Sequence, residues 1–215
     1  MSEMFYNCEN LKSINLSKFN SKNLINMTKM FYGCKNLNEI NFKSMNIIKV
    51  IDMSYMLCNC GINKINLSFK NNNNLTNMKG MFSNCQNLIN VDFSSLNTQK
   101  VTDMSFMFEG CNNLKNINLS YLNTDNAINM KGMFSKSNLI NVNLSFLDTK
   151  NVKDMSYFFS ESKNINNNHL SALNTRNVID MSHIFEKCDL TNTNLSHFNT
   201  QNVENMDFFL PNAKI

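Results

Sequence analysis

Hydrophobic and polar residues follow one order along the chain, and this order repeats about every 26 residues. The clearest copy begins with apolar residues at positions i, i+3, i+4 and i+7, namely Met104, Met107, Phe108 and Cys111. That spacing places all four on one face of a helix of about two turns. Ile117 and Leu119 then alternate with polar residues, which is typical of a short strand. After a polar turn, a second extended piece leads into the next copy.

The same pattern starts again at each leading methionine: Met1, Met27, Met53, Met78, Met104, Met130, Met155, Met181 and Met206. We interpret the chain as a single repeat domain, 1–215, of eight full copies starting at residues 1, 27, 53, 78, 104, 130, 155 and 181 and a truncated ninth, 206–215. A period of this size predicts an α/β solenoid, because one copy cannot bury its apolar face alone. We expect parallel strands from neighbouring coils and one short helix in each coil.

An Asn or Asp stands before each leading methionine after the first: Asn26, Asp52, Asn77, Asp103, Asn129, Asp154, Asp180 and Asn205. We interpret this column as helix N-caps, because these short side chains accept hydrogen bonds from the free N–H groups of a first turn. Asparagine also fills most other polar positions. We expect it to occupy solvated turns there rather than to carry chemistry of its own.

Composition narrows the classes of function. Hydrophobic residues form 42% of the chain, and 17 Phe with 16 Met supply enough bulk for a continuous core. The net charge is only +4 and the Lys and Arg residues are scattered, which argues against a nucleic-acid partner. No apolar run approaches the roughly 18 residues that a transmembrane helix needs. Residues 1–11 are repeat sequence without a visible secretory signal, and truncation of a longer array would hide such a signal.

Seven cysteines could form a metal or redox ladder, or a column of small buried thiols. Six of them share one register, namely Cys8, Cys34, Cys60, Cys85, Cys111 and Cys188, and Cys58 lies outside it. We favour buried thiols, because Ser137 and Ser162 take the same position without disturbing the pattern. The histidines His169, His183 and His197 are expected at the surface. No catalytic or phosphate-binding motif is present, so we predict neither an enzyme nor a cofactor or metal site.

The outward positions of the predicted strands are the candidate partner-binding residues. They form two columns: Ser13, Glu39, Lys64, Asn90, Asn116, Asn141, Asn167 and Asn192, and beside them Asn15, Asn41, Asn66, Asp92, Asn118, Asn143, His169 and Asn194. Solenoids commonly bind partners through such a sheet face. The alternative is that these side chains only stack on one another and keep the coils soluble.

The order Cys-x-x-Leu-x-x-Ile-x-Leu, followed by a turn and by a Phe before the next Cys, resembles the BspA-like leucine-rich repeats. Phe108, Cys111, Leu114, Ile117 and Leu119 occupy these positions in the clearest copy. The motif Asn-Thr-x-Asn-Val-x-x-Met-Ser-x-Met-Phe is also similar to 26-residue repeats of mycoplasma-type surface proteins. The resemblance implies a right-handed β-solenoid with parallel strands and short helices. It also implies cell-surface or secreted proteins that act in adhesion or protein recognition, without enzyme activity.

The leading hypothesis is therefore a non-enzymatic recognition or adhesion module that binds a protein or another cell-surface ligand. The alternatives are a structural spacer without a specific ligand, and a solenoid that binds ice or another regular lattice. The last is prompted by the recurring threonines Thr98, Thr124, Thr149, Thr175 and Thr200. A cytoplasmic location is the alternative to the cell surface.

Overall fold

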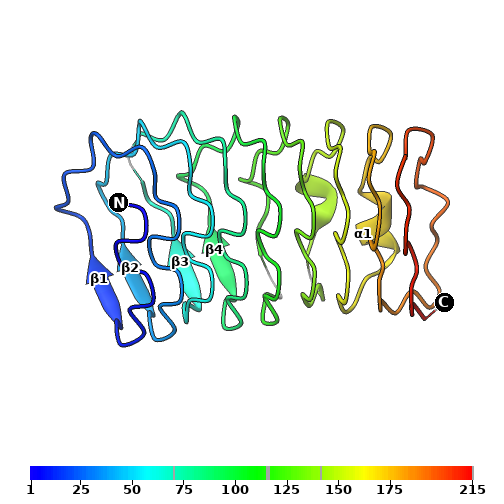
Figure 1. The fold of residues 1–215 in the computed structure, drawn as a ribbon, viewed down its shortest axis with the longest axis horizontal. Helices are drawn as coiled ribbons and strands as arrows, with labels where there is room; N and C mark the ends of the chain where they lie inside the picture. The colour runs from blue at the N-terminus through cyan, green and yellow to red at the C-terminus, as the bar shows by residue number, and fades with distance from the viewer. Residues whose placement is uncertain (70, 115–116, 141, 215) are drawn as a thin grey trace.

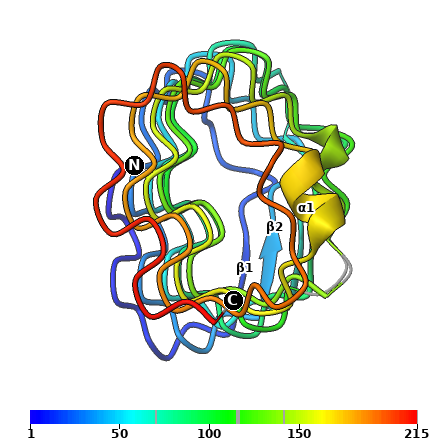
Figure 2. The same cartoon turned by 90° about the vertical axis from the view of Figure 1, so that its right-hand side faces the viewer.

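The chain forms a nearly straight stack of similar coils, one for each sequence repeat (Figure 1). The structure is a computed structural model that describes residues 1–69, 71–114, 117–140 and 142–214. Seen along the stack, the coils overlie one another around a shared interior (Figure 2). We number the coils one to nine by their leading methionines. The two chain termini lie at opposite ends of the stack (Figure 1).

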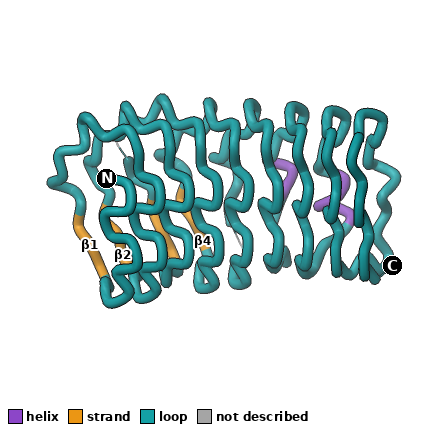
Figure 3. Tube along the Cα trace, viewed as in Figure 1, coloured by secondary structure: helices purple, strands orange, loops and turns teal. Residues whose placement is uncertain are grey.

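Short parallel strands occur where the alternating pattern predicts them in the first four coils. β1 (Ser13–Asn15) pairs with β2 (Glu39–Asn41), and β3 (Lys64–Asn66) pairs with β4 (Asn90–Asp92). The register is that of the repeat, since residues at the same position of neighbouring copies are partners. The prediction of short parallel strands is thus confirmed for these coils, while most of the described chain is loop and turn (Figure 3).

A second line of parallel pairing runs along the whole stack at the Asn/Asp column before the leading methionines. Single bridges join consecutive members from Asn26 to Asn205. Each side chain also accepts a hydrogen bond from the N–H two residues later, as Asp103 Oδ1 does from Ser105 at 2.9 Å. The column therefore caps a turn, but no helix follows it.

The predicted helix after this column is wrong. In coil five, the N–H groups of Phe106 and Phe108 donate to carbonyls of coil six, at 2.7 and 3.0 Å. The intervening N–H groups of Met107 and Glu109 donate three residues back, at 3.3 and 3.2 Å. Phe106 and Gly110 have φ of +57° and +67°, a left-handed conformation that interrupts any helix. The segment is a run of tight turns, bonded to the next coil at every second residue.

Coil spacing explains why turns replace the helix. Paired parallel strands lie about 4.8 Å apart, whereas an α-helix with its side chains is about 10–12 Å wide. Helices could stack behind such strands only if the coils fanned apart on the helix side. Here backbone hydrogen bonds join the coils on both sides, so the stack stays straight (Figure 1). The turns still place every third or fourth side chain inside.

Within the described residues, two short helical elements lie on the strand side of later coils. η1 spans Leu144–Phe146, and α1 spans Asn167–Ser171 where coil seven was predicted to continue the strands. Asn166 caps α1 by accepting hydrogen bonds from Asn168 and His169. Coil seven has a run of asparagines where other coils alternate, so it lacks the pattern that holds a strand. Among the described residues, no helix has the length and apolarity needed to cross a bilayer.

The interior contains the apolar columns that the repeat predicts. The leading methionines from Met27 to Met181, the second methionines such as Met107 and Met133, and the strand residues Ile117 and Leu119 are buried. Phenylalanine rings stack between coils: the Phe82 and Phe108 centroids are 5.8 Å apart, and those of Phe108 and Phe134 are 5.7 Å apart. Burial of this apolar surface from coil to coil holds the stack together.

Candidate recognition surface

The two predicted partner-binding columns follow the strands on the outer side of the coils. In the first column, Ser13, Glu39 and Lys64 are exposed and Asn90 is half-buried. The register of β1 with β2 and of β3 with β4 aligns these side chains along the stack. This column therefore presents a hydroxyl, an acid, a base and an amide in sequence. In coils one to three the repeat keeps the shape of the coil while the exposed residue changes, and from Asn90 onward the position is asparagine in every copy.

The second column and the later coils complete the predicted surface. Asn15, Asn66, Asn118, Asn143, Asn167, Asn192 and Asn194 are exposed, and Asn41 and Asp92 are half-buried. Asn116 and Asn141 lie outside the described residues. The structure thus brings the described members together on one side of the stack, with His169 as the exception.

Most members of the second column have a structural role. Their side-chain oxygens accept a hydrogen bond from the N–H two residues later: Ser17 to Asn15, Lys43 to Asn41, Ser94 to Asp92, Ser120 to Asn118, Ser145 to Asn143 and Ser196 to Asn194, all at 2.8–3.0 Å. This Asx turn ends β1, β2 and β4 and recurs at the same position in coils five, six and eight. The backbone therefore favours Asn or Asp at these positions, and the first column has more freedom to vary.

Two members of the second column also interact between coils. Asn66 Nδ2 donates to Asp92 Oδ2 at 2.9 Å. Hydrogen bonds from the hydroxyl and the N–H of Ser94 lower the pKa of Asp92, which keeps it ionised as an acceptor at neutral pH. The pair fixes the orientation of both side chains on the surface of β3 and β4.

The prediction that His169 faces outward is wrong. Its side chain is 3% exposed, while Asn168, predicted to point inward, is exposed. His169 Nε2 lies 2.9 Å from the carbonyl oxygen of Val142, and Nδ1 accepts from the N–H of Asn166 at 3.2 Å. α1 causes this exchange, because consecutive side chains of a helix do not alternate between two faces, and His169 and Leu170 both lie on its buried face.

His169 should make stability depend on pH. Burial lowers its pKa from 6.5, and the hydrogen bond to Val142 opposes this shift. The folded chain therefore holds the neutral ring, while the unfolded chain binds a proton near pH 6.5. The contribution of the neutral His169 ring to the free energy of unfolding is fully present above pH 6.5. We expect this contribution to be lost as the pH falls below 6.5 and through the lower pKa of the folded state. Urea unfolding between pH 8 and pH 5 measures this loss.

The control variant is His169→Gln, which keeps His183 and His197 and removes only this titrating ring. Its overall stability can differ, but the loss between pH 8 and pH 5 should be smaller than in the unaltered chain. An equal loss in both proteins would show that His169 does not titrate in this range.

A hollow of about 540 Å³ opens on the strand side between η1 and α1. Its lining includes Asn143, Asn166, Asn168 and His169. It lies beside the second column, where the regular strands have given way to helical turns. The hollow adds a concave feature to an otherwise regular surface, and such features favour specific recognition.

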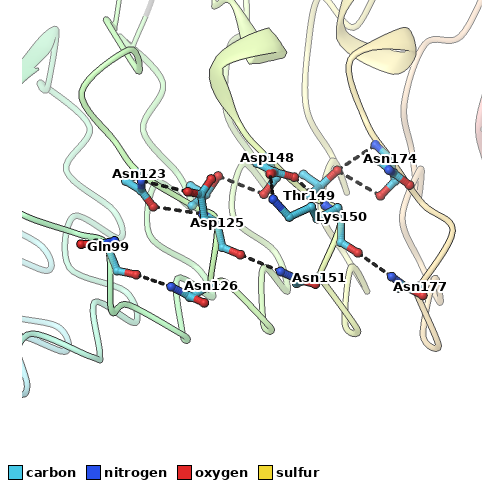
Figure 4. A network of polar contacts seen from close by, with 11 residues as sticks. Gln99, Asn123, Asp125, Asn126, Asp148, Thr149, Lys150, Asn151, Asn174 and Asn177 are labelled. Atoms are coloured by element: carbon cyan, nitrogen blue, oxygen red, sulfur yellow. Dashed lines mark hydrogen bonds and ion pairs between the residues drawn. The ribbon is translucent and has the colours of Figure 1, made fainter.

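A polar network that sequence reasoning did not assign a role runs beside the turns that follow the strands (Figure 4). Asn126, Asn151 and Asn177 each donate through Nδ2 to a backbone carbonyl of the preceding coil, all at 2.7 Å. These contacts correct the expectation that most asparagine only fills solvated turns. The signal was present in the sequence, because the three residues recur at one position of the repeat.

The threonine column cannot present a flat binding array. Thr98, Thr124, Thr149 and Thr175 are buried, and each hydroxyl donates to a backbone carbonyl of the next coil at 2.9–3.0 Å. Only Thr200, in the last complete turn, is exposed. The hydroxyls join coils rather than face solvent, which removes the observation that prompted a lattice-binding solenoid.

The cysteine column is buried from coil two onward, and Cys8 is exposed. All seven cysteines lie in the described part of the chain and none forms a disulfide. Cys111 Sγ donates to the Phe82 carbonyl at 3.2 Å, and Ser137 Oγ donates in the same way to Phe108 at 2.6 Å. Serine thus replaces cysteine because both are small donors. Burial raises the pKa of the Cys85 thiol to about 12, so it is a poor nucleophile at neutral pH.

The remaining histidines and acidic groups form no metal centre in the described residues. No three His, Cys, Asp or Glu side chains there are grouped closely enough to hold an ion. His183 is half-buried between the rings of Tyr157 and Phe208, with centroid distances of 4.3 and 4.9 Å. His197 is exposed.

The repeats match a known family along the whole chain. A family model described as "Mycoplasma protein of unknown function, DUF285" matches residues 1–90, 58–169 and 139–215. The chain belongs to the DUF285 family. No curated protein and no solved structure matches it.

Membership agrees with the similarity to mycoplasma-type repeats noted from the sequence. The three overlapping matches follow from the repeats, since a segment of several coils fits the family at more than one register. The family description assigns no activity. The function of this DUF285 chain must therefore be argued from its own surfaces.

Proposed function

We propose that this DUF285 chain is a non-enzymatic recognition or adhesion module carried by a surface or secreted protein. We propose further that its coils form a right-handed solenoid related to the BspA-like leucine-rich repeats. The partner would be a protein or another cell-surface ligand bound along the strand side, with Ser13, Glu39 and Lys64 making direct contacts.

The observation that supports this proposal is the contrast between the interior and the first column. The interior repeats the same residue types from coil to coil, because each coil must fit its neighbours. The first column changes from Ser13 to Glu39 and Lys64 in coils one to three and is asparagine from Asn90 onward. The paired strands hold its first four members on an aligned backbone. Opposite charges in fixed order on a rigid surface favour a partner with complementary charges.

Reversing two of these charges tests the proposal. The double variant Glu39→Lys and Lys64→Glu keeps the net charge and inverts the local pattern. Binding of the labelled chain to a panel of purified extracellular proteins and to whole cells is measured by interferometry and flow cytometry. We expect at least one partner whose affinity falls about tenfold or more in the variant, since apposed like charges cost several kcal/mol.

The matched control is Lys153→Glu with Glu204→Lys, which exchanges exposed charges elsewhere on the coils. It should leave binding unchanged. If no panel member binds, or if both double variants bind as the unaltered chain does, the strand side is not a recognition surface.

A structural spacer is the second candidate, and a specific observation favours it. The Asx turns of the second column and the ladder of Asn126, Asn151 and Asn177 use asparagine to hold coils together. A spacer needs that rigidity and no particular surface. It predicts that the charge reversal changes no interaction of the chain.

A further inference from the structure

Aromatic side chains form a column on the side of the coils that the tight turns build. They stand two residues after the leading methionine: Tyr55, Phe106, Tyr157, His183 and Phe208. The turn side begins at the N-terminus, and Figure 2 shows the N-terminus and strands β1 and β2 on different sides of the coil. This column is therefore separate from the strand surface.

Glycines at the same position keep the rings in place. Gly80 and Gly132 occupy coils four and six, each with φ of +57°. A Cβ on Gly80 would overlap the ring of Tyr55, and one on Gly132 would overlap the ring of Phe106. The rings of coils three and five thus lean over glycine coils, whereas the Tyr157 ring of coil seven stacks on His183 of coil eight at a centroid distance of 4.3 Å. Rings two coils apart are separated by about 10 Å along the stack, twice the spacing of paired strands.

A hollow of about 380 Å³ opens in this surface beside Phe106 and Tyr157. The small, buried residues Ser135 and Ser160 line it, and charged side chains that include Glu109 and Glu161 complete the lining. The site therefore combines flat apolar faces with hydrogen-bonding groups, in a concave space large enough for a small ring.

The charges around this hollow balance one another. Lys136 lies 4.0 Å from Glu161, and Lys187 lies 3.7 Å from both Glu161 and Glu186. Lys131 Nζ lies over the ring of Tyr157, 5.2 Å from its centroid. Such a mixed lining has no electrostatic preference for a polyanion or for a polycation. It favours a neutral ligand that both donates and accepts hydrogen bonds.

We propose that this hollow and the aromatic column bind a neutral carbohydrate. A pyranose ring has an apolar C–H face that packs on an aromatic ring, and hydroxyls at its rim that bond to carboxylates, ammonium groups and serines. Phe106 and Tyr157 are the stacking residues, and Glu109, Glu161 and Lys131 are the hydrogen-bonding residues.

The site does not depend on the recognition surface proposed above, since it uses a different side of the coils and different residues. A chain that binds glycan through the turn side could fail to bind any protein through the strand side. The two proposals are therefore separated by their variants.

Isothermal titration calorimetry tests the site with the full chain and three neutral hexasaccharides, of β-linked glucose, mannose and N-acetylglucosamine. We expect at least one to bind. Phe106→Ala and Tyr157→Ala should each weaken that binding about tenfold, the factor that corresponds to ~1.4 kcal/mol for one stacking contact. Phe106→Leu should weaken it similarly, because leucine keeps apolar bulk without a flat face.

The control is Tyr121→Ala, which removes a 57% exposed ring beside the strands and should leave glycan binding unchanged. The double variant Glu39→Lys and Lys64→Glu should also bind glycan as the unaltered chain does. Thermal unfolding followed by circular dichroism establishes that each variant is folded. Failure of all three sugars to bind, or binding by the Phe106→Leu and Tyr157→Ala variants as tight as that of the unaltered chain, would overturn the proposal.

Discussion

Replacing Phe108 with alanine is expected to lower the free energy of unfolding by about 3–5 kcal/mol. Phe108 is fully buried, and its ring stacks between Phe82 and Phe134 in the neighbouring coils. It also meets Phe93 edge-on at 6.3 Å. The substitution removes a contact with each neighbour and leaves a cavity in the middle of the stack. Because each coil is stabilised by its neighbours, coils on both sides lose support.

Urea denaturation followed by circular dichroism measures this loss. The matched control is Phe146→Ala in η1, where the ring is 49% exposed, and its cost should stay below about 1 kcal/mol. If Phe108→Ala cost no more than Phe146→Ala, the phenylalanine rings would not share one interior.

Gly61→Ala is the second large effect, with an expected cost of about 3 kcal/mol. Gly61 lies in the turn of coil three, one of the coils that lack one residue between the cysteine and the strand. A Cβ there would overlap the carbonyl oxygen of Lys35 in coil two and lie 2.9 Å from its carbonyl carbon. The obstacle is backbone, which cannot rotate away as a side chain can. We therefore expect the upper part of the usual range for overpacking.

Coil six offers a matched comparison, because Asn138 takes the place of Gly61 in the same shortened turn. Asn138 is half-buried and accepts a hydrogen bond from Asn164 Nδ2 at 2.6 Å. Asn138→Ala should therefore cost about 1 kcal/mol. Thermal and urea unfolding of the two variants give the comparison, and an equal cost would mean that coils two and three can move apart.

The interior could be predicted from the sequence because one pattern serves every coil. Met107 and Phe108 recur at fixed positions, and a residue that repeats in register must meet its own kind in the next coil. The strands β1 to β4 follow for the same reason, since alternation with period two has few other interpretations. These predictions needed no knowledge of how far apart the coils lie.

The same pattern could not distinguish the predicted helix from the tight turns that the structure contains. Side chains at i, i+3, i+4 and i+7 share a face in a helix, but successive tight turns place the same residues inside. The left-handed positions Phe106 and Gly110 carry residues of different types, so the sequence contains no consistent glycine signal for them. Only the close backbone pairing between coils excludes the helix.

Only part of the candidate surface could be predicted from the sequence. The exposure of Ser13, Glu39 and Lys64 follows from strand alternation. The exchange of Asn168 and His169 does not, because it depends on a single helical turn in α1. The sequence also does not predict that Phe106 and Tyr157 lie beside one hollow, because their distance from each other depends on how the coils stack.

Periodicity in the sequence was enough to predict a chain of equivalent coils, the apolar columns of their interior and the strands β1 to β4. It also predicted strands in the later coils, where coil seven has α1 instead. These properties depend on periodicity, and periodicity is local information repeated many times. The role of each polar residue depends on contacts between coils. A buried Thr124, a capping Asp103 and a bridging Asn126 are all short polar residues in turns, and only the carbonyl groups of the adjacent coil distinguish them.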